Sequence, residues 1–292
     1  MILIGENLNI MSGPVSQAMQ KGDAGPIIDI ARRQSEAGMD YIDINIGPAR
    51  RDGIALMRRL ITILQDAVDI GLSLDTTNMD AMEAGLAVCR APALINSVSL
   101  QSSRIERGLE IAAKYGADVI GLLWSNEGMP RDANERAMHA VDFIYRANRA
   151  GIPDERIWID PIVSPVSVDH NQVKACTEFI QMLPDIAPEC RSIIGLSNIS
   201  NGTPSMLRGW LNRTYLVMLL RYGLSAAIVD AFDTELIDIA RNRRPDIVNL
   251  IYRAMEGDLP DINNTDASLL KYARTVRVLT GDSLYSHSWL EA

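Results

Sequence analysis

The sequence has few of the residues that bind metals or form covalent cross-links. Among its 292 residues are three histidines, scattered along the chain, and three cysteines that form no CxxC pair. The cysteines are Cys89, Cys176 and Cys190. We therefore expect neither a disulfide framework nor a protein-bound metal, and the composition fits a reducing cytoplasm.

Little in the sequence indicates a nucleic-acid or membrane partner. The formal net charge is -9, with a pI near 4.9, whereas a nucleic-acid interface needs a basic face. No uncharged apolar run reaches the ~18 residues of a membrane span. The chain starts with Met1-Ile2-Leu3-Ile4, which lacks a basic segment and resembles a first strand, so we expect no signal peptide.

The sequence is rich in short apolar runs that stop at a polar side chain. The run Leu72-Ser73-Leu74, for example, ends at Asp75, and Ile157-Trp158-Ile159 ends at Asp160. Continuously apolar runs of this length are typical of parallel strands that are buried on both faces. The polar residues at these ends are Glu6, Asp43, Asn45, Asp75, Asn96, Asp160, Ser197, Asn198 and Asp230.

Strand and helix patterns alternate along most of the chain. The apolar runs predict strands at residues 2–4, 41–46, 72–75, 93–96, 119–123, 157–160, 193–196 and 226–229. Three-to-four spacing of apolar residues predicts helices at 27–38, 54–68, 81–88, 105–115, 133–150, 173–183, 206–222 and 234–256. Eight strand–helix units predict an α/β protein with a (β/α)₈ TIM barrel over residues 1–257. An open doubly wound sheet is the alternative, but its usual GxGxxG turn is missing.

The end of the chain exceeds what eight units require. Residues 258–264 form a polar, proline-containing linker, and 267–279 have helical spacing. We expect residues 258–292 to be a C-terminal helical extension, packed on the barrel or at a subunit contact. The last residues, including Tyr285 and Trp289, need not be ordered.

The strand ends should meet at one mouth of the barrel, where active sites of this fold lie. The set is rich in carboxylates and amides, which suit the donor and acceptor edge of a neutral heterocycle. Each strand-end residue has a structural alternative, because Asp and Asn also cap the helix that follows. Asp75, for example, could cap the helix that follows it. The choice between capping and a role in the site stays open for Asp43 and Asp230.

Seven motifs resemble the family of methyltetrahydrofolate:corrinoid protein methyltransferases. They are IGENLN (4–9), DINIGP (43–48), LDTTN (74–78), INS (95–97), IDP (159–161), GLSNIS (195–200) and NRT (212–214). They extend in order over most of residues 1–250. The resemblance implies a pterin-binding barrel, usually a homodimer. It also implies tetrahydrofolate or 5-methyltetrahydrofolate as substrate, and a cobalamin carried by a separate corrinoid protein.

The resemblance also implies which residues form the site. Asn198 would lie beside N5, the methyl-bearing nitrogen, and Asp160 would support it in catalysis. The polar edge of the pterin would be held by Asp75, Asn96 and Asp160. The whole implied set is Glu6, Asp75, Asn96, Asp160, Ser197, Asn198 and Arg208.

Two other functions remain as alternatives. A dihydropteroate synthase-like enzyme would share the barrel, although no Lys follows Gly195 in the motif at 195–200. A non-catalytic folate-binding protein would keep the pterin contacts without turnover. The direction of methyl transfer and the corrinoid partner are open, and Asn7 stands where the resembled family commonly has Arg.

Overall fold

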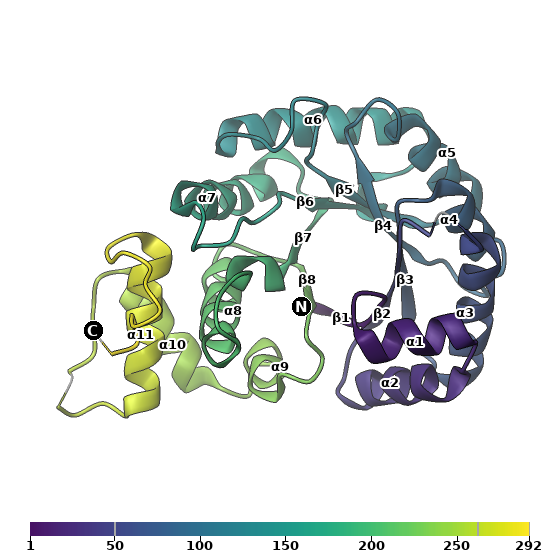
Figure 1. Cartoon of the computed structure of the whole chain (residues 1–292). Helices are drawn as coiled ribbons and strands as arrows, with labels where there is room; N and C mark the ends of the chain where they lie inside the picture. Colours follow the sequence, from purple (N-terminus) through teal and green to yellow (C-terminus); the bar gives the residue numbers. More distant parts are fainter. Residues whose placement is uncertain (50, 262, 292) are drawn as a thin grey trace.

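The computed structural model describes residues 1–49, 51–261 and 263–291, and within them eight parallel strands close into a barrel in sequence order (Figure 1). They are β1 (Ile2–Asn9), β2 (Tyr41–Gly47), β3 (Gly71–Thr76), β4 (Leu94–Ser99), β5 (Asp118–Leu122), β6 (Ile157–Asp160), β7 (Arg191–Gly195) and β8 (Ala226–Val229). Strand β1 pairs with both β2 and β8, so no sheet edge is left open. The barrel prediction is confirmed, and the open sheet is wrong.

Side chains alternate along each strand between the barrel interior and the surrounding helices. Ile4, Leu94 and Trp158 belong to the apolar cluster inside the barrel, whereas Ile95 and Ile159 pack in the larger cluster under the helices. Because the strand period is two, the next inward position lies two residues further along. That position is polar on three strands, since Glu6, Asn96 and Asp160 follow the three interior residues.

Eleven α-helices of the described residues surround the barrel (Figure 1). They are α1 (Gly13–Lys21), α2 (Ala24–Glu36), α3 (Gly53–Ala67), α4 (Met79–Leu86), α5 (Ile105–Tyr115), α6 (Ala133–Arg149), α7 (His170–Ile186), α8 (Ser205–Leu220), α9 (Thr234–Ala240), α10 (Pro245–Met255) and α11 (Ala267–Thr280). No helix among the described residues is both long and apolar enough to cross a membrane.

Two helix predictions need correction. The single helix expected at 234–256 is divided into α9 and α10. Asn242 has a left-handed φ of 58°, which interrupts the helix. Pro245 is the first residue of α10, a position at which the N–H that proline lacks would have no helical partner. Proline also disfavours helical geometry in the residue before it, so the two helices stay separate. Helix α1 was not predicted at all, because its nine residues bury only Val15, Ala18 and Met19.

The C-terminal segment is packed rather than loose. Helix α11 contacts α10 and α8 on the outside of the ring, where Figure 1 shows it in yellow. The chain then returns along it: Trp289 is buried, and its Nε1 donates to Oγ1 of Thr275 at 3.0 Å. The hydroxyl of Tyr285 lies 2.8 Å from Oγ1 of Thr203. The expectation that Tyr285 and Trp289 need not be ordered is wrong, and the domain boundary at 257 stays a prediction.

We predict that Trp289→Ala lowers the free energy of unfolding by about 3 kcal/mol, because it removes a large buried side chain and leaves a cavity. The matched control is Leu284→Ala in the same segment, where the side chain is 92% exposed. Urea unfolding followed by circular dichroism measures both. Equal stability of the two variants would mean that the segment adds nothing to the fold.

Candidate functional site

Strand register brings three predicted polar residues side by side at the mouth. Asn45 and Asp75 are direct partners across β2 and β3, and Asp75 and Asn96 are partners across β3 and β4. The Asn45 amide donates a hydrogen bond to the Asp75 carboxylate. Asp43 accepts from Nδ2 of Asn96 at 2.8 Å and from Oγ of Ser73 at 2.7 Å. The result is a connected floor of amides and carboxylates.

The capping alternative is wrong for the strand-end acids. Helix α4 is capped by Asn78, whose side chain accepts from two main-chain amides, and not by Asp75. Helix α9 is capped by Asp233. Asp230 instead accepts from Nδ2 of Asn7 at 2.8 Å and from the main-chain amide of Phe232, ahead of the helix, at 2.9 Å. Asp43 lies inside the barrel, where it is bound by side chains from β3 and β4. These acids are therefore free of helix capping and face the barrel or its mouth.

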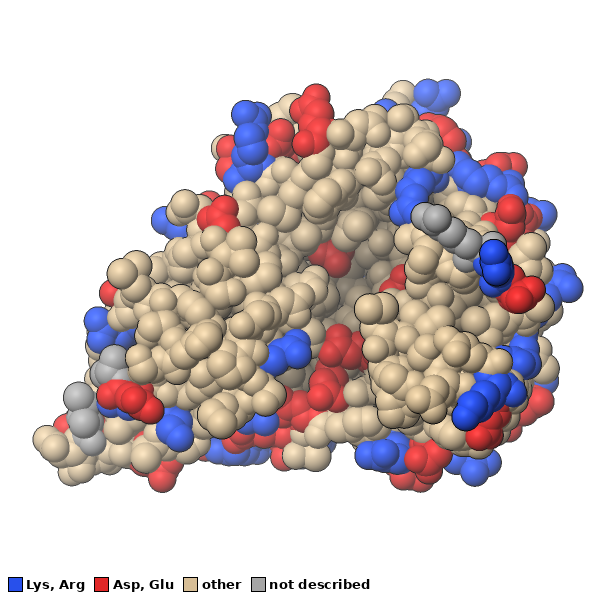
Figure 2. All heavy atoms as spheres, viewed as in Figure 1, with Lys and Arg blue, Asp and Glu red and all other residues tan. Residues whose placement is uncertain are grey.

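Asp160 ends β6 on another side of the mouth. Only 8% of the residue is exposed, and Oδ1 accepts from the main-chain amide of Ile162 at 2.8 Å. Figure 2 shows that the centre of this face is hollowed, with Asp and Glu side chains at the floor and along one side. The hollow is thus an acidic, hydrogen-bonding recess.

A second group of residues lies where β1 and β8 meet the segment after β7. Oγ of Ser197 donates to Oε1 of Glu6 at 2.6 Å. Arg208 donates from Nη2 to the carbonyl of Ser197 at 3.3 Å and from Nε to Oγ of Ser200 at 3.0 Å. A cavity of about 470 Å³ is bordered by Glu6, Ser197, Arg208 and Asp230. The structure therefore brings Glu6, Ser197 and Arg208 together, as predicted.

Asn198 is placed differently from the other predicted residues. It lies in the short 3₁₀ turn Leu196–Ser200 after β7, and its side chain is exposed. Its Oδ1 accepts from Nδ2 of Asn201 at 3.3 Å. The motif puts it at the correct strand end, but this contact leaves its role at N5 a prediction.

Burial raises the pKa of the acids at the mouth. It raises the pKa of Asp43 and of Asp160 to about 6, against opposing hydrogen bonds from Asn96 and Ser73 in the first case and from main-chain amides in the second. Burial, with the neighbouring Asp43 charge, raises the pKa of Asp75 well above its ordinary value. Burial, with the charges of Asp230 and Asp43, also raises the pKa of Glu6. Near neutral pH the site can hold both donating carboxyls and accepting carboxylates.

Sequence reasoning missed two polar contributors. Ser73 lies two residues before Asp75 on the same inward face, so its place in the alternation could have revealed it. Arg136 lies within the predicted helix 133–150, yet it is fully buried and donates to the carbonyls of Pro161 and Ile162, in the turn that follows Asp160. Its signal was a charged residue on the apolar stripe that includes Ala133 and Ala140.

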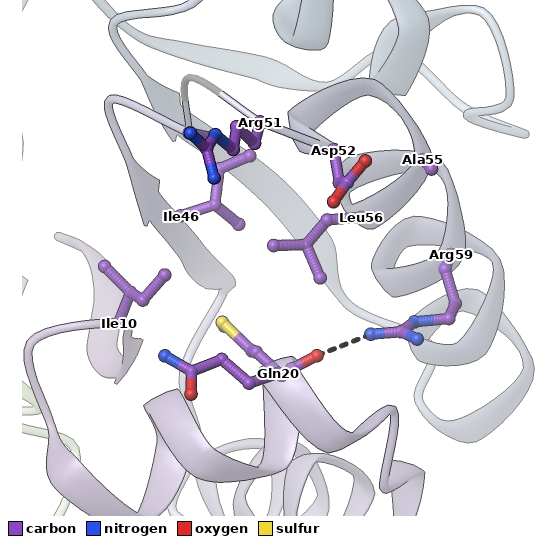
Figure 3. Close-up of a pocket in the computed structure, with 10 residues that line it drawn as sticks. Ile10, Gln20, Ile46, Arg51, Asp52, Ala55, Leu56 and Arg59 are labelled. Carbon is purple, nitrogen blue, oxygen red and sulfur yellow. Dashed lines mark hydrogen bonds between the residues drawn. The ribbon is translucent and has the colours of Figure 1, made fainter.

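Another cavity lies outside the barrel wall, between α1 and α3. It has a volume of about 490 Å³ and is lined by Ile10, Ile46 and Leu56 beneath Arg51 and Arg59 (Figure 3). Nη2 of Arg59 donates to the carbonyl of Met19 at 2.7 Å. The predicted site residues lie elsewhere, on the inward faces of the strands or after them.

No three His, Cys, Asp or Glu side chains of residues 1–49, 51–261 and 263–291 are grouped as a metal site requires. The acids of the mouth are instead spaced by amides and hydroxyls, as the contacts of Asp43 show. That donor set fits an organic heterocycle better than a cation.

The fold and this mouth define a class of protein. A model of the pterin binding enzymes matches residues 5–230, and the chain belongs to that family. It is 28% identical over 232 residues to a methylcorrinoid:tetrahydrofolate methyltransferase of Eubacterium limosum, a match that covers 79% of this chain and 85% of that protein. It is also 29% identical over 241 residues to a methionine synthase of Mycobacterium tuberculosis, covering 79% of this chain but 20% of that longer protein.

Solved structures with the same fold include dihydropteroate synthases. The enzyme of Xanthomonas albilineans superposes with a TM-score of 0.62 at 18% identity, covering 84% of this chain and 92% of that one. The enzyme of Yersinia pestis gives a TM-score of 0.61 at 20% identity, over 84% and 93%. At these identities the likeness is one of fold.

We predict that Asp43→Asn changes how stability depends on pH. The folded pKa of about 6 exceeds the unfolded value of about 3.9, so the proton favours the folded state. Wild-type protein should therefore lose stability from this group as pH rises from about 4 to about 6, and the variant should not. The difference in unfolding free energy, variant minus wild type, should become more positive over that window.

Urea unfolding at pH 4.5 and pH 7 measures this difference. Asp29→Asn, at an exposed position on α2, serves as the control. A difference for Asp43→Asn that is flat with pH would show that the buried carboxyl keeps an ordinary pKa.

Proposed function

We propose that this protein moves a methyl group between N5 of a tetrahydrofolate and the cobalt of a corrinoid carried by a separate protein. The observation that carries the proposal is the placement of Asp75, Asn96 and Asp160 at the mouth of a pterin-binding barrel. The similarity to the methylcorrinoid:tetrahydrofolate methyltransferase supports the choice of reaction. The similarity to two mycobacterial methionine synthases supports it in the same way.

The polar floor suits the flat, hydrogen-bonding edge of a pterin. An ionised Asp accepts N–H bonds, and an Asn amide both donates and accepts, so Asp75, Asn96 and Asp160 together match alternating ring donors and acceptors. Because the floor is buried, a pterin atom left without a partner costs about 1–3 kcal/mol. Ser197, Arg208 and Glu6 would border the rest of the substrate.

The chemistry asks little of the protein beyond positioning and electrostatics. In the direction towards the corrinoid, an electron pair on cobalt(I) attacks the methyl carbon as the carbon–nitrogen bond breaks. The bonding pair stays on N5, which takes up one proton from solvent. An amide such as Asn198 can hold a hydrogen bond that strengthens as the charge on N5 changes, and Asp160 would support the network. In the reverse direction the same contacts serve, with tetrahydrofolate as the methyl acceptor.

The rim of the mouth supports docking of the corrinoid protein. Large apolar side chains are exposed on four loops and on the first turn of α8, each of which follows a strand, and a partner would cover them there. They are Met11, Trp124, Val168, Met206 and Phe232. Docking there would bring the corrinoid over N5 without a channel through the protein.

We also propose a homodimer, as the resemblance implies. Helix α6 exposes Met138, Val141 and Tyr145 at spacings of three and four, an apolar stripe that a second copy could cover. Sedimentation velocity of the whole chain tests this, because a single species of monomer mass at micromolar concentration contradicts it. A cytoplasmic location stays a prediction, which the three free cysteines support.

The direct test of the reaction is spectroscopic. The protein is mixed with 5-methyltetrahydrofolate and free cob(I)alamin, and in a second arm with methylcobalamin and tetrahydrofolate. We expect protein-dependent conversion in at least one arm. A third arm supplies a dihydropterin pyrophosphate and 4-aminobenzoate. Condensation there with no methyl transfer would favour the dihydropteroate synthase alternative, and folate binding with no turnover in any arm would favour a non-catalytic protein.

We predict that Asn198→Ala slows methyl transfer by roughly ten- to a thousand-fold, the range expected for one lost transition-state contact. Affinity for the folate should fall by clearly less, because the contact strengthens as the bond breaks. Single-turnover mixing measures the rate, and fluorescence titration measures the affinity.

The matched control is Asn126→Ala, an exposed amide on the loop after β5 that binds Ser102. It should leave both quantities near the wild-type values. Equal losses of rate and affinity in Asn198→Ala would make Asn198 a binding residue only.

A further inference from the structure

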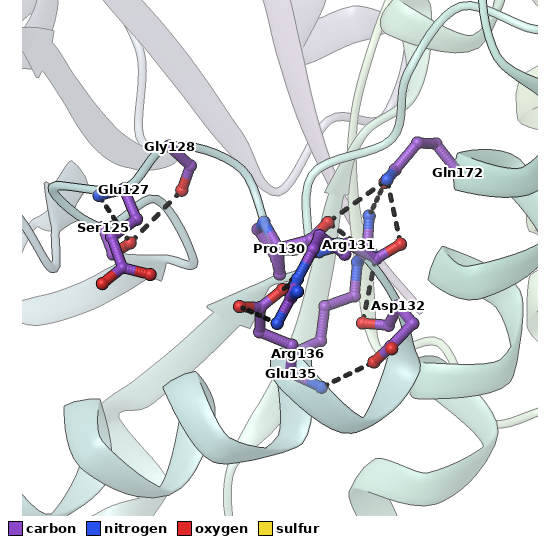
Figure 4. Close-up of polar contacts among 9 residues, drawn as sticks. All are labelled: Ser125, Glu127, Gly128, Pro130, Arg131, Asp132, Glu135, Arg136 and Gln172. Atoms are coloured by element: carbon purple, nitrogen blue, oxygen red, sulfur yellow. Dashed lines mark hydrogen bonds and ion pairs between the residues drawn. The ribbon is translucent and has the colours of Figure 1, made fainter.

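Arg136 of α6 is a fully buried charge. Figure 4 shows its side chain among Pro130, Asp132 and Gln172. A guanidinium has five N–H donors, and here each of its five hydrogen bonds goes to a neutral oxygen. Nε donates to Pro161 O at 2.9 Å, Nη1 to Pro130 O at 3.4 Å and Asp132 O at 3.2 Å, and Nη2 to Ile162 O at 3.3 Å and the Gln172 amide at 2.7 Å. No carboxylate in this set neutralises the charge.

Burying a charge without a paired carboxylate costs desolvation free energy and destabilises the fold, so we expect Arg136 to serve a function. Burial lowers the pKa of Arg136, but a guanidinium stays protonated at any working pH. Its buried titratable neighbours stay neutral, since burial raises the pKa of Cys176 to about 12 and that of Tyr215 well above its ordinary value. The carboxylate of Asp132 caps α6. The acid of the site that interacts electrostatically with the Arg136 charge is Asp160.

The bonds of Arg136 also secure an uncommon backbone conformation. Ile162 has a φ of 64°, in the left-handed region that a β-branched residue avoids. Its amide donates to Oδ1 of Asp160, and this bond exists only while the turn keeps its shape. Arg136 binds the carbonyls of both Pro161 and Ile162, and so holds the two peptide units that fix the turn.

We propose that Arg136 is the positioning residue of the site: it clamps the turn Asp160–Ile162 so that the Asp160 carboxylate faces the mouth beside a fixed positive charge. That the carboxylate then meets a pterin rests on the function proposed above. Burial pushes Asp160 towards its protonated form, and the main-chain amides of Ile162 and Gly195 work against this, followed by the charge of Arg136. The residue thus keeps an acceptor available at the mouth.

The test measures Asp160 itself, in ligand-free protein. Carboxyl carbons of ¹³C-labelled aspartate are followed by NMR through a pH titration, and Asp160→Asn identifies the signal. In Arg136→Met the Asp160 midpoint should rise by roughly one pH unit, because the Ile162 amide bond that the clamp secures and the opposite charge are lost together. Arg136→Lys keeps the positive charge but loses the planar set of guanidinium donors. The Asp160 midpoint in this variant should therefore stay closer to the wild-type value.

Gln172→Glu probes the same charge without removing Arg136. It places a carboxylate on the guanidinium from the half-buried start of α7, and it should raise the Asp160 midpoint. The change also removes the hydrogen bonds that Nε2 of Gln172 donates to the carbonyls of Pro130 and Arg131, so circular dichroism first checks that the variant is folded. This variant decides the matter if Arg136→Met fails to fold. The control is Arg156→Met at the other end of β6, where the side chain pairs with Asp118.

Titration of tetrahydrofolate by calorimetry links this role to the ligand. Arg136→Met should lose about threefold in affinity near pH 6.5 and little at pH 8, where Asp160 is ionised in both proteins. An Asp160 midpoint that is unchanged in both Arg136→Met and Gln172→Glu would overturn the proposal and leave Arg136 a structural residue. If wild-type protein binds no tetrahydrofolate, the proposed function fails, while the NMR titration still decides the role of Arg136.

Discussion

The pleat of a closed parallel barrel is the constraint on which this site depends. Inward side chains repeat every second residue, and the interior is filled by apolar residues such as Ile4, Leu94 and Trp158. Whatever stands two residues further along each strand must face the mouth. Cross-strand register then makes Asp75 a neighbour of both Asn45 and Asn96, so the polar floor follows from strand geometry and not from flexible loops.

The same geometry buries carboxylates, and their loss of hydration disfavours the ionised form. Hydrogen bonds to these carboxylates partly offset that cost. Asp43 lies inside the barrel, and two side-chain donors on neighbouring strands hold its carboxyl. The ionised form of Asp160 is stabilised by the main-chain amides of Ile162 and Gly195 and by the charge of Arg136. Both acids have a pKa raised to about 6, which places their ionisation near the pH at which a cell works. A site of this kind is ready to exchange hydrogen bonds with a heterocycle, and it holds its groups in place before the ligand arrives.

Much of this arrangement could be predicted from the sequence, because it repeats. Eight apolar runs, seven of them with polar ends, predict the barrel and its mouth. Asp75, Asn96 and Asp160 lie at that mouth, although their contacts with a pterin stay predictions. Helix α1 could not be found, since three buried residues give too weak a periodicity.

The role of Arg136 could not be found either, for a different reason. A helical pattern shows that a charged residue shares the apolar face, but not which carbonyl groups lie opposite it. Those carbonyls belong to loops up to 26 residues away in the chain, and to a turn whose left-handed Ile162 breaks the usual preference. Tertiary contacts of this kind carry no local signal.

The central claim is that this mouth holds a reduced pterin by its polar edge. A crystal structure of the protein with bound tetrahydrofolate tests it most directly. The account predicts hydrogen bonds from the pterin ring to Asp75, Asn96 and Asp160, with N5 turned towards Asn198. A pterin seated elsewhere, for example in the cavity between α1 and α3, with these three side chains keeping only their present partners, would contradict it.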